Sequence, residues 1–334
     1  MKIRTILIVL AAGVLSAGCE QSAKEAADAT GEAAATAAPS TDAAPAPVVI
    51  DPNLPEGLQT TAEQLRAFRR VQCSTVDAEP VTFGWRGRAF SRVEGEKDRH
   101  LWNVEGMNIR HCVTVNDPEL GAGFRLITRE ILLYLDPQTN EVLRTWRNPW
   151  TGADNQVLHV ANDPVNQGPM FSSMGGRDFQ MPYQFSGDHW WLTSTIPLFY
   201  QNPLGGDYQQ YVGGIYHATE MFNFMGDIDS LTSDEEGTAD VAVGWSRMSN
   251  WLPWMQMSGR QGLIYMHTAG RKLASFDDLP DVMKDEIALN YPEYNRPPPI
   301  DDTRKNETSW TYFRKMVESG EFKGSGGDAA SGGH

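Results

Sequence analysis

The chain has 334 residues, of which 43 are acidic and 28 are lysine or arginine, so its formal net charge is −15. A surface this acidic repels the phosphate backbone of nucleic acids and excludes a general role in binding them. The length suits one large domain or two small ones.

The first residues have the pattern of an export signal. Lys2 and Arg4 precede an apolar run, and Ser16-Ala17-Gly18 lead into Cys19. This order predicts a bacterial lipoprotein signal peptide over residues 1–18, with lipid on Cys19 after cleavage. An ordinary signal peptide with a chance cysteine is the alternative. The apolar run is too short for a transmembrane helix.

Composition divides the rest of the chain into three parts. Residues 19–50 are rich in Ala and Pro, lack aromatic side chains and are predicted to be a disordered tether. Residues 51–322 are predicted to form a single β-rich domain, and 323–334 a disordered tail. Cys73 and Cys112 are either a disulfide or two buried free thiols, and the sequence leaves both open.

The elements of the domain begin with a helix and continue as strands. Thr60 and Glu63 form a capping-box pattern that predicts a helix after Thr60. Apolar residues then recur with period two in segments such as "VTFGWRGRAF", "GFRLITREILLYLD", "ADVAVGWSRM" and "GLIYMHTAG". Two closing helices are predicted, one from near Pro280 to about Asn290 and one from Glu307 to Glu318. The fold class is therefore mainly β (α+β): an antiparallel β-barrel or a strongly curved meander with peripheral helices.

Several separated motifs in one order resemble the DUF1838 family. They include "GWRGRAFSRV", "WNVEGMNIR", "REILLYLDPQTNEVLRTWRNPWTG", "HVANDPVN" and "LPWMQMSGRQGLIYMHTAGRKL". The resemblance covers most of the predicted domain and implies a bacterial protein of a family whose members are often exported. It carries over no catalytic residue.

Ionisable residues in apolar rows are the first candidates for a site. Glu130 and Tyr134 share one face of a predicted strand, and Glu220 and Arg247 lie in similar rows of two others. Because a buried, unpaired charge is costly, we expect Glu130, Glu220 and Arg247 to approach one interior site. That site is either a structural ion network or a pocket in which the glutamates act as acid and base.

The segment "QVLHVANDPVN" supplies a second candidate. His159 is predicted to lie on a short strand that ends at residues 162–164, where it could reach a ligand as an acid or base. Asp163 belongs to the following turn and is a candidate ligand contact, although turn formation alone accounts for it. His217 is a weaker candidate for substrate binding, because a satisfied core histidine explains it.

Tryptophans form the third candidate group. Trp190 and Trp191 are adjacent, and Trp251 and Trp254 flank a proline. Exposed tryptophans stack on sugars or aryl groups, whereas buried ones close the ends of a sheet. As a cluster they are predicted to contact substrate.

These candidates predict a lipid-anchored, exported enzyme that cleaves an ether, ester or glycosidic bond in an aromatic or sugar-containing substrate. Its acid/base residues would be Glu130, Glu220 and His159, with Arg247 beside them. The alternative is a non-catalytic lipoprotein that binds an apolar or glycan ligand. No motif for a metal, a cofactor or a serine nucleophile is recognisable. The expected location is the bacterial cell envelope, at the outer rather than the inner membrane and either periplasmic or surface-exposed.

Overall fold

A computed structural model describes residues 50–200, 211 and 216–324 of the chain. The predicted signal peptide, Cys19 and nearly all of the predicted tether and tail lie outside the described residues.

One antiparallel sheet of ten strands organises the described residues. Its first half is β1 (Val81–Arg92), β2 (Arg99–Asp117) and β3 (Gly121–Leu135), to which the short β6 (Val160–Asn162) and β7 (Met170–Phe171) add. Its second half is β10 (Gln184–Ser186), β11 (His189–Tyr200), β12 (Tyr216–Asp227), β13 (Ala242–Ser249) and β14 (Leu263–Leu273). The strand order is β10-β11-β12-β13-β14-β1-β2-β3-β6, so β14 pairs with β1 and joins two meanders.

The sheet does not close into a barrel, so the barrel alternative left open by the sequence is wrong, whereas the mainly β antiparallel class is confirmed. β10 is the strand at one edge of the sheet, and β6, which pairs with β3, is the strand at the other edge. Two small hairpins stand apart from it: β4 (Thr145–Arg147) with β5 (Asp154–Gln156), and β8 (Ser173–Met174) with β9 (Arg177–Asp178).

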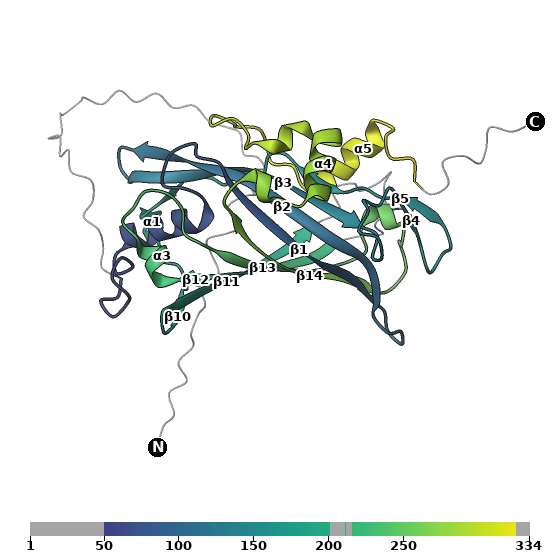
Figure 1. Ribbon diagram of the computed structural model, residues 1–334, viewed down its shortest axis with the longest axis horizontal. Coiled ribbons are helices and arrows are strands. Elements are labelled where there is room, and N and C mark those ends of the chain that lie inside the picture. Colours follow the sequence, from purple (N-terminus) through teal and green to yellow (C-terminus); the bar gives the residue numbers. More distant parts are fainter. Residues whose placement is uncertain (1–49, 201–210, 212–215, 325–334) are drawn as a thin grey trace, which may run out of the picture.

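Helices gather at the ends of the sheet and over one face of β2 and β3 (Figure 1). The N-terminal helix α1 (Thr61–Gln72) begins at the predicted capping box, in which Thr60 and Glu63 exchange hydrogen bonds. It packs near α3 (Ile228–Thr232) at one end. The predicted closing helices are confirmed as α4 (Asp281–Asn290) and α5 (Ser309–Glu318). Short 3-10 turns η1 (Pro253–Met255), η2 (Phe276–Asp278) and η3 (Pro292–Asn295) complete the elements.

Alternation along β2 and β3 gives the sheet two buried faces. On the outer face, Met107, Ile109, Ile131 and Leu133 pack against Met283 and Ile287 of α4. On the inner face, Leu126 joins an apolar cluster with Phe68 of α1. Leu132 and Tyr134 join a second inner cluster with Trp310 of α5. Burial on both faces explains why β3 is apolar almost throughout.

One disulfide links the first helix to the sheet. Cys73 follows α1 directly and is bonded to Cys112 of β2, with their Cα atoms 5.9 Å apart. The two thiols that the sequence left undecided are therefore paired.

Candidate functional site

Two cross-strand pairs place the charged residues of the inner face. Glu130 of β3 lies opposite Asn162 of β6, and Asn162 Nδ2 donates to Glu130 Oε1 at 2.7 Å. Glu220 of β12 lies opposite Arg247 of β13, whose Nη1 donates to Glu220 Oε1 at 2.9 Å. Both pairs follow from strand register, because side chains directly opposite one another on one face are nearest neighbours.

The two pairs face one cavity of about 320 Å³ between the apolar clusters of the inner face. Glu130, Glu220 and Arg247 all line it, so their predicted convergence on one interior site is confirmed as geometry. The sheet curls enough for β3 and β6, near one edge, to face β11 and β12, near the other, across this space. A volume of this size lies at the lower end of the range for small-molecule sites.

Burial distinguishes the two carboxyl groups. It raises the pKa of Glu130, and the nearby charge of Glu220 raises it further, against the hydrogen bond from Asn162 and the charges of Arg247 and Arg110. Glu220 is ion-paired instead, and its side chain is 18 % exposed. Glu130 is therefore the carboxyl that tends to hold a proton, and Glu220 the one held by a cation.

Arg247 bridges Glu220 and the aromatic residues at the same end of the cavity. Its Nη2 donates to the Tyr216 hydroxyl at 3.3 Å. The Tyr216 ring packs edge-on against Trp310, at 4.5 Å between centroids, and Trp310 lines the cavity from α5. Thr308 and Ser309, at the start of α5, line it too. The C-terminal helix thus walls the charged end.

Sequence reasoning missed the cavity residues of β2. Asn108 and Arg110 both line the cavity, and Asn108 lies opposite Glu130 in the register. The available signal was the alternation in "GMNIRH", which places these two side chains on one face. Trp85, Phe222 and Trp245 also line the cavity from β1, β12 and β13.

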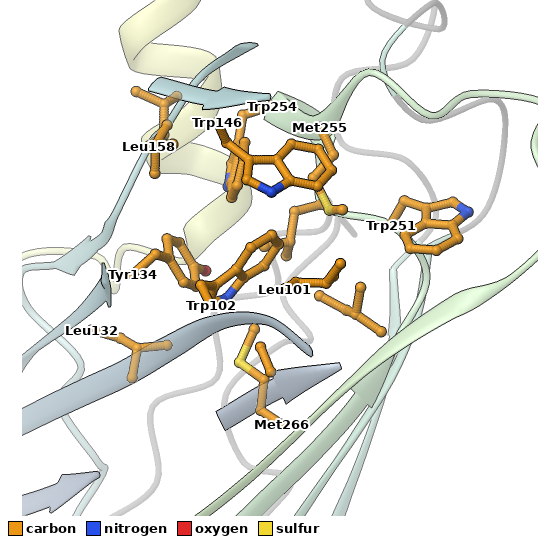
Figure 2. Close-up of a cluster of buried hydrophobic side chains, with 14 of the residues drawn as sticks. Leu101, Trp102, Leu132, Tyr134, Trp146, Leu158, Trp251, Trp254, Met255 and Met266 are labelled. Carbon is orange, nitrogen blue, oxygen red and sulfur yellow. The ribbon is translucent and has the colours of Figure 1, made fainter. Parts of the chain in front are cut away.

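The predicted tryptophans do not line the cavity. Trp251 and Trp254 are buried in the cluster at one end of the sheet, where Trp254 packs against Trp102, Tyr134 and Trp146 (Figure 2). Trp190 is fully buried at the other end and donates its indole N–H to the Asp227 carbonyl. The expectation of ligand-facing indoles is corrected for these three. A tryptophan between turn residues packs the core as readily as it lines a site, and local sequence does not distinguish the two.

Trp191 lies on the face of β11 that is turned away from the cavity. Leu192, Ser194, Ile196 and Leu198 line the cavity from β11, so alternation places Trp191 on the opposite face. It is half-buried there.

His159 is a core histidine that lies outside the cavity lining. Its Nδ1 accepts the backbone N–H of Tyr134 at 3.1 Å, and its ring packs on that of Tyr134 at 5.8 Å. Burial lowers its pKa to about 4, so it is neutral near pH 7. The structure thus separates His159 from Glu130 and Glu220. Alternation turns Val160 and Asn162 of β6 toward the cavity, and His159 precedes this strand and does not share their face.

The three remaining candidates also lie apart from the cavity lining. Tyr134 is buried behind the charged end, where burial raises its pKa and the charge of Arg247 opposes the shift. Asp163 is ion-paired with Arg129 at 3.2 Å and Arg304 at 2.9 Å, which gives it a structural partner on each side. His217 is exposed, and its backbone N–H donates to Asn250.

Within the part of the chain that the structure describes, no three histidine, cysteine or acidic side chains gather as a metal site. None of the helices in residues 50–200, 211 and 216–324 is long and apolar enough to cross a membrane.

Comparison with known proteins assigns the sequence that carries this cavity to a family. Curated proteins give no significant match. The family model described as "Protein of unknown function (DUF1838)" matches residues 78–317. That range contains every cavity-lining residue except those of α1. The chain therefore belongs to the DUF1838 family.

Proposed function

We propose that this protein is an exported enzyme that cleaves an ether, ester or glycosidic bond of a small sugar- or aromatic-containing substrate. The cavity between the two apolar clusters would be its active site. One observation carries the proposal: a carboxyl group with a raised pKa, Glu130, and an ion-paired carboxylate, Glu220, line the same cavity. A carboxylic acid with a raised pKa beside a second carboxyl group is a common arrangement for acid/base catalysis.

The two glutamates would have different roles. Asn162 occupies Glu130 Oε1 as a hydrogen-bond donor, which leaves Oε2 to carry a proton and deliver it to the leaving oxygen. Glu220 would accept a proton from water or from the substrate. Arg247 would orient Glu220 through its Nη1 contact and is a positioning residue as well as a source of positive charge.

An activity screen tests this proposal. The full-length chain carrying Cys19→Ser, which cannot be lipidated at that position, is assayed against chromogenic aryl ethers, aryl esters and glycosides. Glu130→Gln and Glu220→Gln should each lower the turnover of an accepted substrate by about a hundredfold or more. The rate should fall as the pH rises through the raised pKa of Glu130, because only the protonated acid can protonate a leaving group.

The exposed Glu119, between β2 and β3, supplies the matched control, since Glu119→Gln makes the same chemical change far from the cavity. Full activity of both cavity variants would refute the acid/base roles. Loss of activity together with a large fall in melting temperature would indicate that the glutamates are structural.

A second function, ligand binding without catalysis, is favoured by the other walls of the cavity. Phe68, Phe83 and Leu126 lie toward α1, and Phe224 and Val243 complete an apolar surface there. In a binding protein the Glu220–Arg247 pair would only orient the ligand. Saturable binding of a compound that is never turned over would favour this function.

We propose further that the chain is a lipoprotein of the bacterial cell envelope. The support is the order of charged, apolar and small residues before Cys19. Cys19→Ser should move the protein from the membrane pellet to the soluble fraction. Persistence of the variant in the pellet would contradict a lipid anchor at this residue.

A further inference from the structure

Arg110 is the cation of the cavity that has no acidic contact. It lies on β2, in the part of the cavity toward α1. Its Nη1 donates to Gln72 Oε1 at 2.6 Å and its Nε to Asn108 Oδ1, both of which are uncharged amide oxygens. Its guanidinium carbon lies 4.8 Å from the centroid of the Phe83 ring. These contacts fix the guanidinium in place and leave its charge uncompensated.

No ion pair formed by the described residues includes Arg110, and its Nη2 group has no hydrogen-bond acceptor among them. Burial lowers the pKa of Arg110 to about 10, opposed only by the more distant charge of Glu130. Glu130 itself has a raised pKa. A half-buried guanidinium that keeps a free donor and lacks an anion is costly for the protein alone.

A second buried basic residue, Lys272, lies beside Phe83. Lys272 Nζ lies 5.4 Å from the Phe83 centroid, and its pKa is lowered well below its ordinary value by burial and then by Arg110 and Arg70. Its Nζ already donates to the carbonyls of Arg70 and Ala239 and to the Thr238 hydroxyl. Lys272 is therefore satisfied within the protein, and Arg110 is the cation that remains available to a ligand.

We propose that the ligand of this cavity carries an anionic group, a carboxylate or a sulfonate, which Arg110 binds through its free donors. The proposal rests on the proposed function only in taking the cavity as a ligand site. The apolar body of the ligand would lie along Phe83, Leu126 and Phe224, and its far end would reach Glu130 and Glu220. The substrate class is then an amphipathic acid, such as an aromatic carboxylic acid joined to a second group by the bond to be cleaved.

Two fluorescent dyes with one skeleton test the charge preference. 8-Anilinonaphthalene-1-sulfonate and N-phenyl-1-naphthylamine differ only in the sulfonate. Their affinities are measured with the full-length Cys19→Ser chain and with the same chain carrying Arg110→Gln or Arg110→Lys. Loss of a charge-assisted hydrogen bond should lower the affinity of Arg110→Gln for the sulfonate by about tenfold or more. Its affinity for the neutral dye should stay within about twofold, and Arg110→Lys should retain part of the preference.

The exposed Arg88 provides the matched control. It lies on the neighbouring strand β1, and alternation with Trp85 places it on the opposite face of the sheet. Arg88→Gln removes the same charge and should leave both affinities unchanged. A competition experiment needs no cavity variant: cinnamate should displace the bound dye at concentrations at which cinnamamide does not.

Three results would overturn the anion site: equal loss of both dyes in Arg110→Gln, no loss of either, or equal competition by cinnamate and cinnamamide. Saturable binding of the neutral dye would still support the cavity as a ligand site in those cases. If neither dye binds the chain saturably, the anion site and the ligand-binding cavity are both wrong. A chain that binds the dyes as expected but turns over no substrate contradicts only the enzymatic proposal.

Discussion

Glu105 shows how a single buried carboxyl makes folding depend on pH. It lies on the outer face of β2 and is 7 % exposed. Arg86 faces it from β1, with Nε 3.8 Å from Glu105 Oε2, but the arginine side chain extends into solvent. Burial raises the pKa of Glu105 to about 6, and Arg86 offsets only part of the shift. The folded chain therefore keeps a proton here at pH values where the unfolded chain has lost it.

The sign of this effect gives the first prediction. Because the folded pKa is raised, the stabilisation from Glu105 is complete below pH 4.5 and is lost as the pH rises through about 6. Glu105→Gln cannot ionise, so its stability relative to the wild type should improve between these pH values by roughly 1 kcal/mol. Urea unfolding of both chains at several pH values measures the difference. Glu94→Gln, an exposed change between β1 and β2, should follow the wild type throughout. A pH-independent difference for Glu105→Gln would contradict the prediction.

Residue faces were predictable from the sequence where a strand is long and regular. Period-two alternation placed Glu130, Glu220 and Arg247 on the correct faces, because these three strands have no bulge near them. The same alternation was present in β2, but no other feature of that segment marked Arg110 as a residue of a site. His159 and the tryptophans could not be assigned, since their burial depends on segments far away in the chain.

At the level of elements, the close approach of β1, β2 and β14 depends on glycines opposite Trp85. Trp85 pairs with Gly106 on one side and Gly270 on the other. A Cβ on Gly106 would lie 2.1 Å from Trp85 Nε1, so the indole occupies the space that a side chain would fill. Trp85 lines the cavity and packs on Trp245 at 6.5 Å between centroids. Gly106 therefore shapes the cavity wall without lining it.

Gly106→Ala should disturb both stability and the cavity. Overpacking against the indole should lower the free energy of unfolding by about 1–3 kcal/mol, and the displaced Trp85 should weaken binding of N-phenyl-1-naphthylamine. Gly244→Ala on β13 is the control, because a Cβ there would meet nothing closer than 3.7 Å. That change should be neutral or slightly stabilising. Urea unfolding and dye titration of both variants measure the effects, and equal behaviour of the two would contradict the steric argument.

The overall arrangement was only partly accessible from the sequence. The N-terminal capping box and the two closing helices are local patterns, and their positions were predicted to within a few residues. The pairing of β14 with β1 and the open edges of the sheet are set by contacts between distant segments. The Cys73–Cys112 bond is of the same kind, because it depends on where α1 meets β2. Closure and cross-links are therefore properties of the whole molecule.

The whole molecule should unfold as one cooperative unit. Both inner clusters include residues of the same strands: Phe83 and Ala89 of β1 belong to different clusters, as do Val243 and Trp245 of β13. The outer cluster shares β2 and β3 with them. Since β14 and β1 pair along eleven residues, neither meander can unfold without breaking hydrogen bonds to the other.

Most tryptophans report on the cluster at one end, whereas the far-ultraviolet circular dichroism signal reports on the entire sheet. The urea transitions that the two methods report should therefore coincide. They should also coincide in a Trp190→Phe variant, in which that residue, at the opposite end, is the only tryptophan replaced. Separate midpoints for fluorescence and circular dichroism would show that the two ends fold independently and would contradict a single cooperative domain.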